Sequence, residues 1–142
     1  MSHMRKTMNE IRLAAPELLT KLFHALDSCD YDTLVACFAE TGSWTRQGKT
    51  LKGQAEIRDA LVARPTTLST IHIANNILID EVSTQSAAAR FYLTAYRYNS
   101  PSPPPYPVPL PAAVGLCKAA FGCDGQSWRL NELQTGPYVF AN

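Results

Sequence analysis

The hydrophobic pattern of this chain changes from a helical period to a strand-like period near Pro65. Before that point, apolar residues recur every three to four positions, apart from one short hairpin pattern. After it, long stretches rich in Ile, Phe, Tyr and Leu are separated by polar turns. Helices followed by long strands predict an α+β fold, with helices packed on one face of a strongly curved, mostly antiparallel sheet.

The helices are placed by their apolar stripes and their capping residues. Pro16 suits a first helical turn, where its missing N–H costs nothing. Asp30 is a suitable N-cap for a second helix, which we expect Gly42 to end. The expected helices span residues 15–28, 31–39 and 53–65.

The strands are placed by β-branched and aromatic runs between turn residues. They are expected at residues 43–45, 50–51, 69–82, 87–98, 114–122 and 127–139. Residues 100–111 hold seven of the ten prolines, so this segment cannot form a central strand. We interpret it as a long, extended hairpin loop; a docking site for a proline-reading module is the alternative.

Length and charge exclude several classes of protein. The chain has 142 residues, which suits one domain over residues 8–142 after a flexible N-terminus, residues 1–7. A net charge of +1 offers no basic field for nucleic acid or an anionic membrane. No apolar stretch is long enough to span a bilayer, and the N-terminus lacks a signal-peptide pattern. We therefore expect a cytoplasmic protein that binds neither nucleic acid nor membrane.

The four cysteines form no CxxC pair and have no histidines at zinc-ligand spacing. We expect them to be reduced and mostly buried, with one structural disulfide as the alternative. The credible histidines, His24 and His72, lie far apart in the sequence. We therefore expect no metal site. The sequence also lacks a glycine-rich phosphate-binding loop, so we expect no nucleotide cofactor.

Asp27 is the most informative single residue. It follows Leu19 and Phe23 at steps of four, so it continues an apolar stripe. It also lies in the last helical turn, where the helix dipole disfavours a carboxylate. These two arguments indicate a partner for Asp27. A solvated carboxylate at a frayed helix end, or a cap for the next helix, remains the alternative.

His72 lies within an apolar strand pattern, Ile71-His72-Ile73. A buried imidazole needs partners for its ring nitrogens, and a core histidine bonded to the backbone is the usual explanation. If Asp27 accepted the N–H of one ring nitrogen, it would fix the tautomer and make the other nitrogen more basic. The pair would then act as a general base.

One face of the strand over residues 88–98 carries polar and aromatic side chains: Arg90, Tyr92, Thr94, Tyr96 and Tyr98. Arg90, Tyr92 and Tyr96 are candidate substrate-binding residues if this face lines a pocket. The alternative is an exposed or dimer-facing sheet surface. Asn76, which shares parity with His72, and Trp44, near the second helix, are further candidates; a core tryptophan is an equal alternative for Trp44.

Several segments resemble the SnoaL-like group of the nuclear-transport-factor-two-like superfamily. The likeness extends over roughly residues 10–135. It is carried by the segments Glu17–Phe38, Gly42–Trp44, Lys52–Leu61, Ile71–Asn76 and Ser127–Leu130. The resemblance implies a conical α+β barrel whose cavity lies between sheet and helices, with Asp27 and His72 on its floor.

Within that superfamily, the Asp27 and His72 placement is similar to that of scytalone dehydratase and hexachlorocyclohexane dehydrochlorinase. The resemblance implies a cofactor-independent lyase or isomerase, dehydratase- or cyclase-like, acting on a small apolar or cyclic molecule. His72 would be the general base and Asp27 would orient it. The pattern departs from scytalone dehydratase, since no second histidine stands in the stretch Ala89–Tyr92.

A different functional class stays open from the same resemblance. Small subunits of ring-hydroxylating dioxygenases share this fold and carry no metal of their own. The chain could thus be a noncatalytic ligand-binding or assembly subunit. In either case we expect a homodimer or homotrimer, and the low charged fraction of 18% leaves room for an apolar subunit contact.

Overall fold

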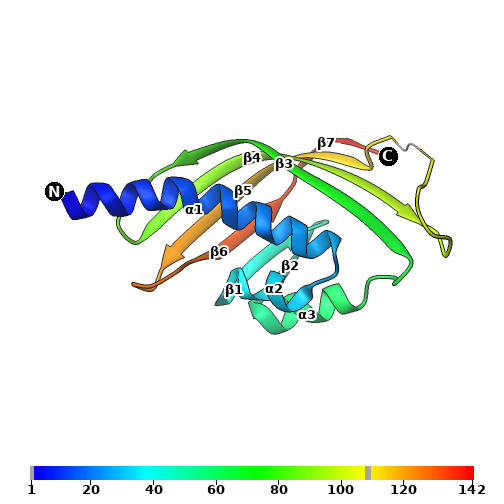
Figure 1. The fold of residues 1–142 in the computed structure, drawn as a ribbon, viewed down its shortest axis with the longest axis horizontal. Coiled ribbons are helices and arrows are strands. Elements are labelled where there is room, and N and C mark those ends of the chain that lie inside the picture. The colour runs from blue at the N-terminus through cyan, green and yellow to red at the C-terminus, as the bar shows by residue number, and fades with distance from the viewer. Residues whose placement is uncertain (1, 108–109) are drawn as a thin grey trace.

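The computed structural model describes residues 2–107 and 110–142, with side chains described from residue 8 onwards. Most helical residues precede the long strands, as Figure 1 shows from blue to red. Within these ranges the elements are α1 (Ser2–Asp27), α2 (Tyr31–Ala36), β1 (Phe38–Arg46), β2 (Lys49–Lys52), α3 (Gly53–Val62), β3 (Leu68–Asp80), β4 (Ser86–Asn99), β5 (Ala113–Cys123), β6 (Trp128–Thr135) and β7 (Tyr138–Ala141).

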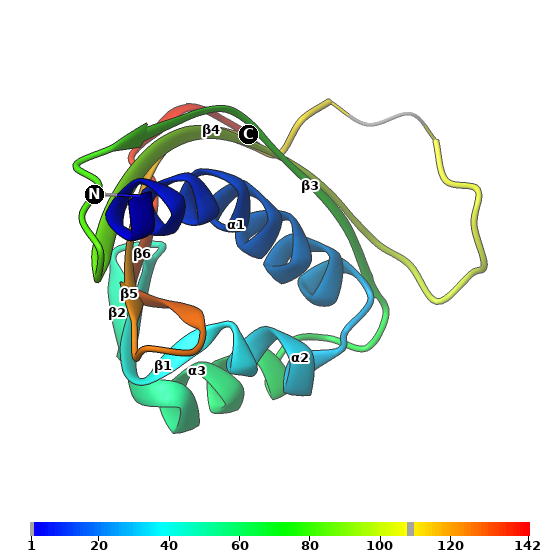
Figure 2. The ribbon, with the colours of Figure 1, turned by 60° about the vertical axis from the view of Figure 1, so that its left-hand side comes forward.

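The strands form one sheet in the order β2-β1-β6-β5-β4-β3, and β7 pairs with β5. Among the described strands, the pairing of β1 with β6 is parallel and the others are antiparallel. The sheet curves around α1, while α2 and α3 lie near β1 (Figure 2). The predicted fold class is confirmed. The sheet is not closed into a barrel, because β2 and β3 remain its edges.

The core lies between α1 and the concave face of the sheet. One stripe of α1 supplies Ile11, Ala15, Leu19, Leu22 and Leu26, all at most 2% exposed. These residues are spaced at three and four positions, which places them on one side of a helix. The facing sheet residues are also buried: Phe91 and Leu93 from β4, Cys117 and Phe121 from β5, and Leu130 and Leu133 from β6.

The helix boundaries differ from the prediction. The first helix begins at Ser2 instead of residue 15, so Pro16 lies inside it. Residue 1 of the segment expected to be flexible lies outside the described residues, while the backbone of residues 2–7 belongs to α1.

Gly42 does not end the second helix, which stops at Ala36; it lies within β1. A Cβ there would lie 2.6 Å from the Leu130 carbonyl oxygen, so glycine permits the close approach of β1 and β6.

The last predicted strand is divided in two. A single strand over residues 127–139 is wrong, because β6 ends at Thr135 and β7 begins at Tyr138. The interruption is Gly136-Pro137, where the glycine has φ +128° and the proline has no N–H for the ladder. The Pro137 carbonyl instead accepts a hydrogen bond from the Leu116 amide at 2.9 Å. This break lets the chain pair with β5 a second time.

The proline-rich segment follows β4, and its residues 100–107 extend away from the helices (yellow in Figure 2). Its Tyr106 ring stacks on Tyr98 of β4, with ring centroids 4.9 Å apart. Residues 108 and 109 of the segment lie outside the described residues. The four cysteines are free: Cys37 and Cys117 are buried, and Cys29, against expectation, is exposed. Within the described part of the chain, none of the helices combines the length and hydrophobicity that crossing a bilayer requires.

Candidate active site

Asp27 is placed by the way α1 ends. Cys29 adopts a left-handed backbone conformation with φ +59°, and the Asp30 amide bonds back to the Ala25 carbonyl at 2.8 Å. The helix therefore stops with Asp27 in its last turn, on the same face as the buried Phe23. Asp30 then caps α2 by accepting from the Thr33 amide at 3.2 Å, as predicted.

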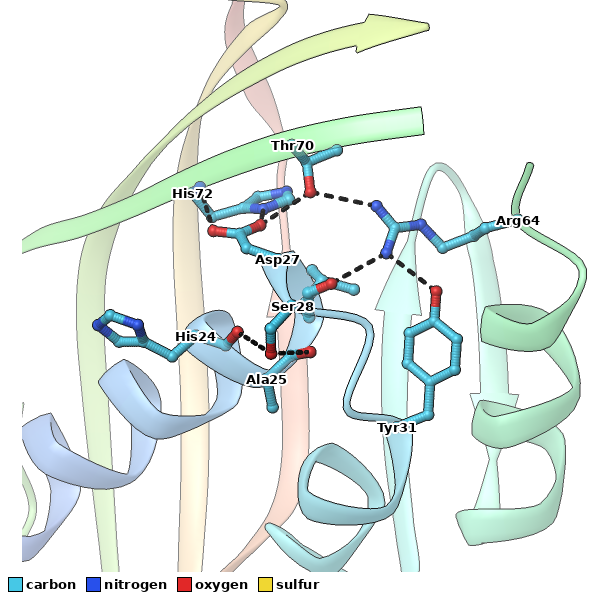
Figure 3. A network of polar contacts seen from close by, with 9 residues as sticks. His24, Ala25, Asp27, Ser28, Tyr31, Arg64, Thr70 and His72 are labelled. Carbon is cyan, nitrogen blue, oxygen red and sulfur yellow. Dashed lines mark hydrogen bonds and ion pairs between the residues drawn. The ribbon is translucent and has the colours of Figure 1, made fainter. Parts of the chain in front are cut away.

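The Asp27 carboxylate accepts three hydrogen bonds from β3. Its Oδ2 accepts from the His72 backbone amide at 2.8 Å. Its Oδ1 accepts from the Thr70 hydroxyl at 2.8 Å and lies 2.6 Å from His72 Nδ1 (Figure 3). These donors compensate the carboxylate for its position at the negative end of the helix dipole. The structure thus brings together the two residues that the sequence analysis paired.

The contact with Asp27 defines the state of the His72 ring. A carboxylate accepts hydrogen bonds, so Nδ1 is the ring nitrogen that donates to Asp27, and in the neutral ring Nε2 carries the lone pair. No described residue hydrogen bonds to Nε2. Phe23 stacks on the ring, with centroids 5.6 Å apart. The His72 and Asp27 side chains are only 11% and 15% exposed, so their contact is largely shielded from water.

Arg64, just after α3, forms hydrogen bonds that help to position Asp27 and His72. Its Nη1 donates to the Leu26 carbonyl at 3.2 Å and to the Tyr31 hydroxyl at 3.5 Å. Its Nη2 donates to the Thr70 hydroxyl at 3.3 Å, and that hydroxyl in turn donates to Asp27 (Figure 3). The guanidinium therefore places positive charge at the C-terminal end of α1 and orients the hydroxyl that holds the carboxylate.

His72 lines a cavity of about 210 Å³ between α1 and the concave face of the sheet. Both apolar and cationic side chains contribute to its wall. The lining residues are Phe23, Leu26, Trp44, Arg46, Gln47, His72, Leu93, Ala95, Arg97, Ala112, Ala113, Thr135, Tyr138, Ala141 and Asn142. Its volume is below the roughly 300–1,000 Å³ usual for drug-sized ligands, so the cavity suits a small guest.

Two further candidates have different positions. Trp44 does line the cavity; it is 2% exposed, and its Nε1 donates to the Thr135 hydroxyl at 3.0 Å. Asn76 does not: it is exposed, with φ +54°, where the register of β3 against β4 shifts between Asn75 and Leu78. This bulge adds a residue to β3 and ends the alternation that had placed Asn76 beside His72.

Arg90, Tyr92 and Tyr96 lie on the opposite face of the sheet from the cavity. Tyr92 is 47% exposed, and Arg90 Nε forms an ion pair with Asp80 Oδ2 at 2.8 Å. The cavity is instead lined by the alternate residues of β4. The expectation that these three side chains line the pocket is therefore corrected, and the alternative of an outer sheet surface describes their position.

The residues that the sequence analysis missed are polar side chains on the inner face. Thr70 precedes His72 by two positions and so shares its face, and Arg97 shares the parity of the buried Leu93. Strand alternation could have identified both. Arg46 carried no such signal, because it lies between the strands expected at residues 43–45 and 50–51, although β1 extends to it. Burial lowers the pKa of Arg46, and the nearby Arg64 and Arg97 lower it further.

The described residues contain no group of three or more His, Cys, Asp or Glu side chains able to hold a metal ion. What the site offers is an imidazole with one free nitrogen, a carboxylate that holds the other, and a wall carrying two guanidinium groups. Such an arrangement can move a proton at a carbon atom placed in the cavity.

Comparison with solved structures shows the same fold. A protein of unknown function with a cystatin-like fold from Nostoc punctiforme is 23% identical; the match covers 87% of this chain and 88% of that one, with a TM-score of 0.72. A candidate scytalone dehydratase from Novosphingobium aromaticivorans is 18% identical over 96% and 91%, with a TM-score of 0.75. A hexachlorocyclohexane dehydrochlorinase is 14% identical over 96% and 90%, with a TM-score of 0.77.

A search of curated proteins found no match. The model of one protein family, the SnoaL-like domain, matches residues 8–134. That range includes Asp27, His72, strands β1 to β5 and all of β6 but its last residue. The chain therefore belongs to the SnoaL-like domain family.

Proposed function

We propose that this protein is a cofactor-independent lyase or isomerase, dehydratase- or cyclase-like, in which His72 is the general base and Asp27 orients it. The observation that carries the proposal is the 2.6 Å contact between Asp27 Oδ1 and His72 Nδ1 at a cavity that can admit a small molecule. Membership of the SnoaL-like family and the fold shared with a dehydrochlorinase support it.

The proposed reaction begins at a carbon–hydrogen bond next to a carbonyl group or a leaving group. His72 Nε2 takes the proton, and the electron pair of the broken bond forms a carbon–carbon double bond. In a lyase, the leaving group departs with its bonding pair and receives a proton from the imidazolium. In an isomerase, the carbonyl oxygen takes up the displaced π pair as an enolate, and that pair returns when the imidazolium gives its proton to another carbon. Asp27 stabilises the imidazolium that exists between the two steps.

The cavity supports the same chemistry by limiting water. The ring of Phe23 covers one side of the imidazole, and Leu26, Leu93 and Ala95 are among the apolar residues of the wall. A neutral, shielded base is suited to removing a proton from carbon, because its lone pair need not first shed a hydration shell. We propose a small, largely apolar or cyclic carbon skeleton as the substrate.

The test uses two simple probes. 3-Hydroxycyclohexanone loses water to give cyclohex-2-enone, and cyclohex-3-enone isomerises to the same product. In D₂O, exchange of the proton next to the carbonyl reports proton removal even without turnover. We expect exchange with the wild type and a loss of at least about a hundredfold in His72→Ala and Asp27→Asn. His24→Ala, which removes an exposed imidazole from α1, is the matched control.

Full exchange by His72→Ala would remove the mechanism, and so would absence of exchange in the wild type with every carbonyl probe. Circular dichroism of each variant distinguishes lost chemistry from lost folding. The proposal thus stands or falls on the imidazole and not on the fold.

A specific observation favours an assembly role as the second candidate. The outer face of the sheet exposes large apolar side chains, among them Ile71 at 57%, Tyr92 at 47% and Leu116 at 46%. Monomeric proteins rarely expose wide apolar surfaces, so this face suits contact with another subunit. A noncatalytic subunit would use this face and leave the cavity unused, and it would show no His72-dependent proton exchange.

A further inference from the structure

The described cavity wall carries positively charged side chains and no Asp or Glu side chain. Arg46 and Arg97 line the cavity, and an adjoining groove shares both and adds Lys49 and Arg64. The described lining of the two hollows contains no Asp or Glu side chain. Because the whole chain has a net charge of only +1, these four cations are a local concentration and not a general property of the surface.

Arg46 is the least satisfied of these groups. It ends β1, and its guanidinium carbon lies 4.8 Å from the centre of the Trp44 ring. Its Nη1 is buried, with no hydrogen-bond partner among the described residues. A buried guanidinium N–H without an acceptor costs free energy, so a native site of this kind is expected to gain an acceptor when it is occupied.

Arg97 adds a second guanidinium group without a hydrogen-bond acceptor among the described residues. It lies on β4 opposite Thr70 of β3, and it is exposed. No described residue accepts a hydrogen bond from its guanidinium or forms an ion pair with it. Arg64 differs, because its nitrogens are already engaged by Leu26, Tyr31 and Thr70. Two guanidinium groups are thus free on the wall that also carries His72.

Among the described residues, no ion pair joins a carboxylate to Arg46 or Arg97. The oxygens of Asp27 accept hydrogen bonds from Thr70 and His72 instead. Arg64 and Arg97 repel the positive charge of Arg46, and a bound anion would reduce this repulsion.

We propose that the substrate of this site carries a carboxylate, which Arg46 and Arg97 bind while the reacting carbon lies at His72. This inference rests on the proposed function and adds the substrate class. A planar guanidinium presents paired donors that match the two oxygens of a carboxylate. Phe23, Leu93 and Ala95 provide apolar surface for the carbon skeleton. At about 210 Å³ the cavity accommodates a small acid of roughly ring size.

The test measures binding and needs no turnover. Benzoate and benzamide have nearly the same shape, and only benzoate is charged near neutral pH. Isothermal titration calorimetry at constant ionic strength gives both dissociation constants. We expect benzoate to bind at least about tenfold more tightly, since hydrogen bonds between charged groups exceed those to neutral ones. Equal affinity, or no benzoate binding, would overturn the proposal and restrict the arginines to charge that develops only during reaction.

Variants assign the preference to named groups. Arg97→Gln, at an exposed position that does not endanger folding, is expected to reduce the benzoate preference to about threefold or less. Arg46→Gln is expected to act in the same direction. Arg12→Gln, on the exposed side of α1, is the matched control and should leave the preference unchanged. A preference that survives in both Arg46→Gln and Arg97→Gln would contradict the assignment.

Two further measurements distinguish this inference from the proposed mechanism and from non-specific anion binding. His72→Ala should lose proton exchange and keep the preference for benzoate over benzamide, so failure of the mechanism and failure of the anion site give different results. Inorganic phosphate is the second arm. If phosphate displaced benzoate at equal concentration, the site would recognise a bare anion and the carboxylate proposal would be wrong.

Discussion

Asp27 holds His72 at two points: one carboxylate oxygen lies 2.6 Å from ring Nδ1, and the other accepts from the His72 backbone amide at 2.8 Å. The side chain of one residue therefore fixes both the ring and the strand that carries it. Since α1 ends at Asp27, the same contact sets where the helix meets β3. The position of the imidazole depends on the packing of two distant elements, and the first two predictions test that dependence.

Asp27→Asn should lower both activity and stability. An amide can accept at only one of its two ends, so its NH₂ group would face a donor of β3. We expect proton exchange at a carbon probe to fall at least about a hundredfold. We expect the free energy of unfolding to fall by about 1–3 kcal/mol. Urea unfolding and exchange measured on the same sample check both; unchanged stability would contradict the double contact.

Thr70→Val tests whether Thr70 is a positioning residue. Valine keeps the shape and loses the hydroxyl that joins Arg64 to Asp27. We expect kcat for a carbon-acid probe to fall about tenfold with little change in KM, and stability to fall by about 1 kcal/mol. Thr70→Ser, which restores the hydroxyl, should recover most of the activity. A KM effect without a kcat effect would show that Thr70 contributes to binding instead.

Cys117 predicts how stability changes at high pH. Burial raises the pKa of this thiol from 9.0 to about 11. Because the folded pKa is raised, the stabilisation is fully present below pH 9 and is lost as the pH rises through 11. The loss attributable to this group is about 2–3 kcal/mol. Urea unfolding of the wild type and Cys117→Ala at both pH values isolates it, since the variant should show a shallower alkaline decline.

The Asp30 cap leads to a prediction about stability at low pH. Hydrogen bonds from the Thr33 side chain and amide lower the pKa of its carboxyl below 3.8. A depressed folded pKa adds stability above the unfolded value, and that stability is lost as the pH falls through the folded one. Asp30→Asn keeps a capping oxygen and cannot titrate. Thermal melts from pH 6 to pH 2 should therefore show a weaker acid dependence in the variant, whereas parallel curves would contradict the cap as its source.

The outer face of the sheet predicts self-association. Phe140 is 69% exposed and Ile71 is 57% exposed, and both belong to the apolar surface opposite the cavity. We expect a homodimer or homotrimer in solution, and we expect Ile71→Lys combined with Phe140→Lys to shift it towards monomer. Light scattering after size-exclusion chromatography measures the mass. Leu13→Lys, at an exposed site on α1, controls for a general effect of added charge.

The sequence predicted the parts of the fold that depend on local periodicity. The α1 stripe placed Asp27 on the buried side, and Asp30 was identified as the cap of α2. Gly42 was misassigned because its role is a contact with Leu130, far along the chain, and local patterns carry no information on such contacts. The start of α1 was misplaced for a different reason: the helical turns before Pro16 have a weaker apolar pattern.

The sequence pattern predicted which residues of a strand share a face. It did not predict which of the two faces lines the cavity. Alternation correctly placed Arg90, Tyr92 and Tyr96 on one face of the strand, but it could not say which face of the strand packs towards α1. The polar and aromatic residues were predicted to line a pocket because such side chains can bind a substrate. Arg97 was the stronger indication, because it shares the parity of the buried Leu93 and so marks a cation on the inner face of the sheet.

The bulge at Asn76 has a consequence for how β3 could change in evolution. Before the bulge, Thr70 and His72 face inward at even positions; after it, Ile77 and Ile79 do so at odd ones. The extra residue shifts the phase of the strand, so its two halves are oriented independently. Deleting Asn76 would force a choice, because a strand with uninterrupted phase can turn either the imidazole or the two isoleucines towards the helix, but not both.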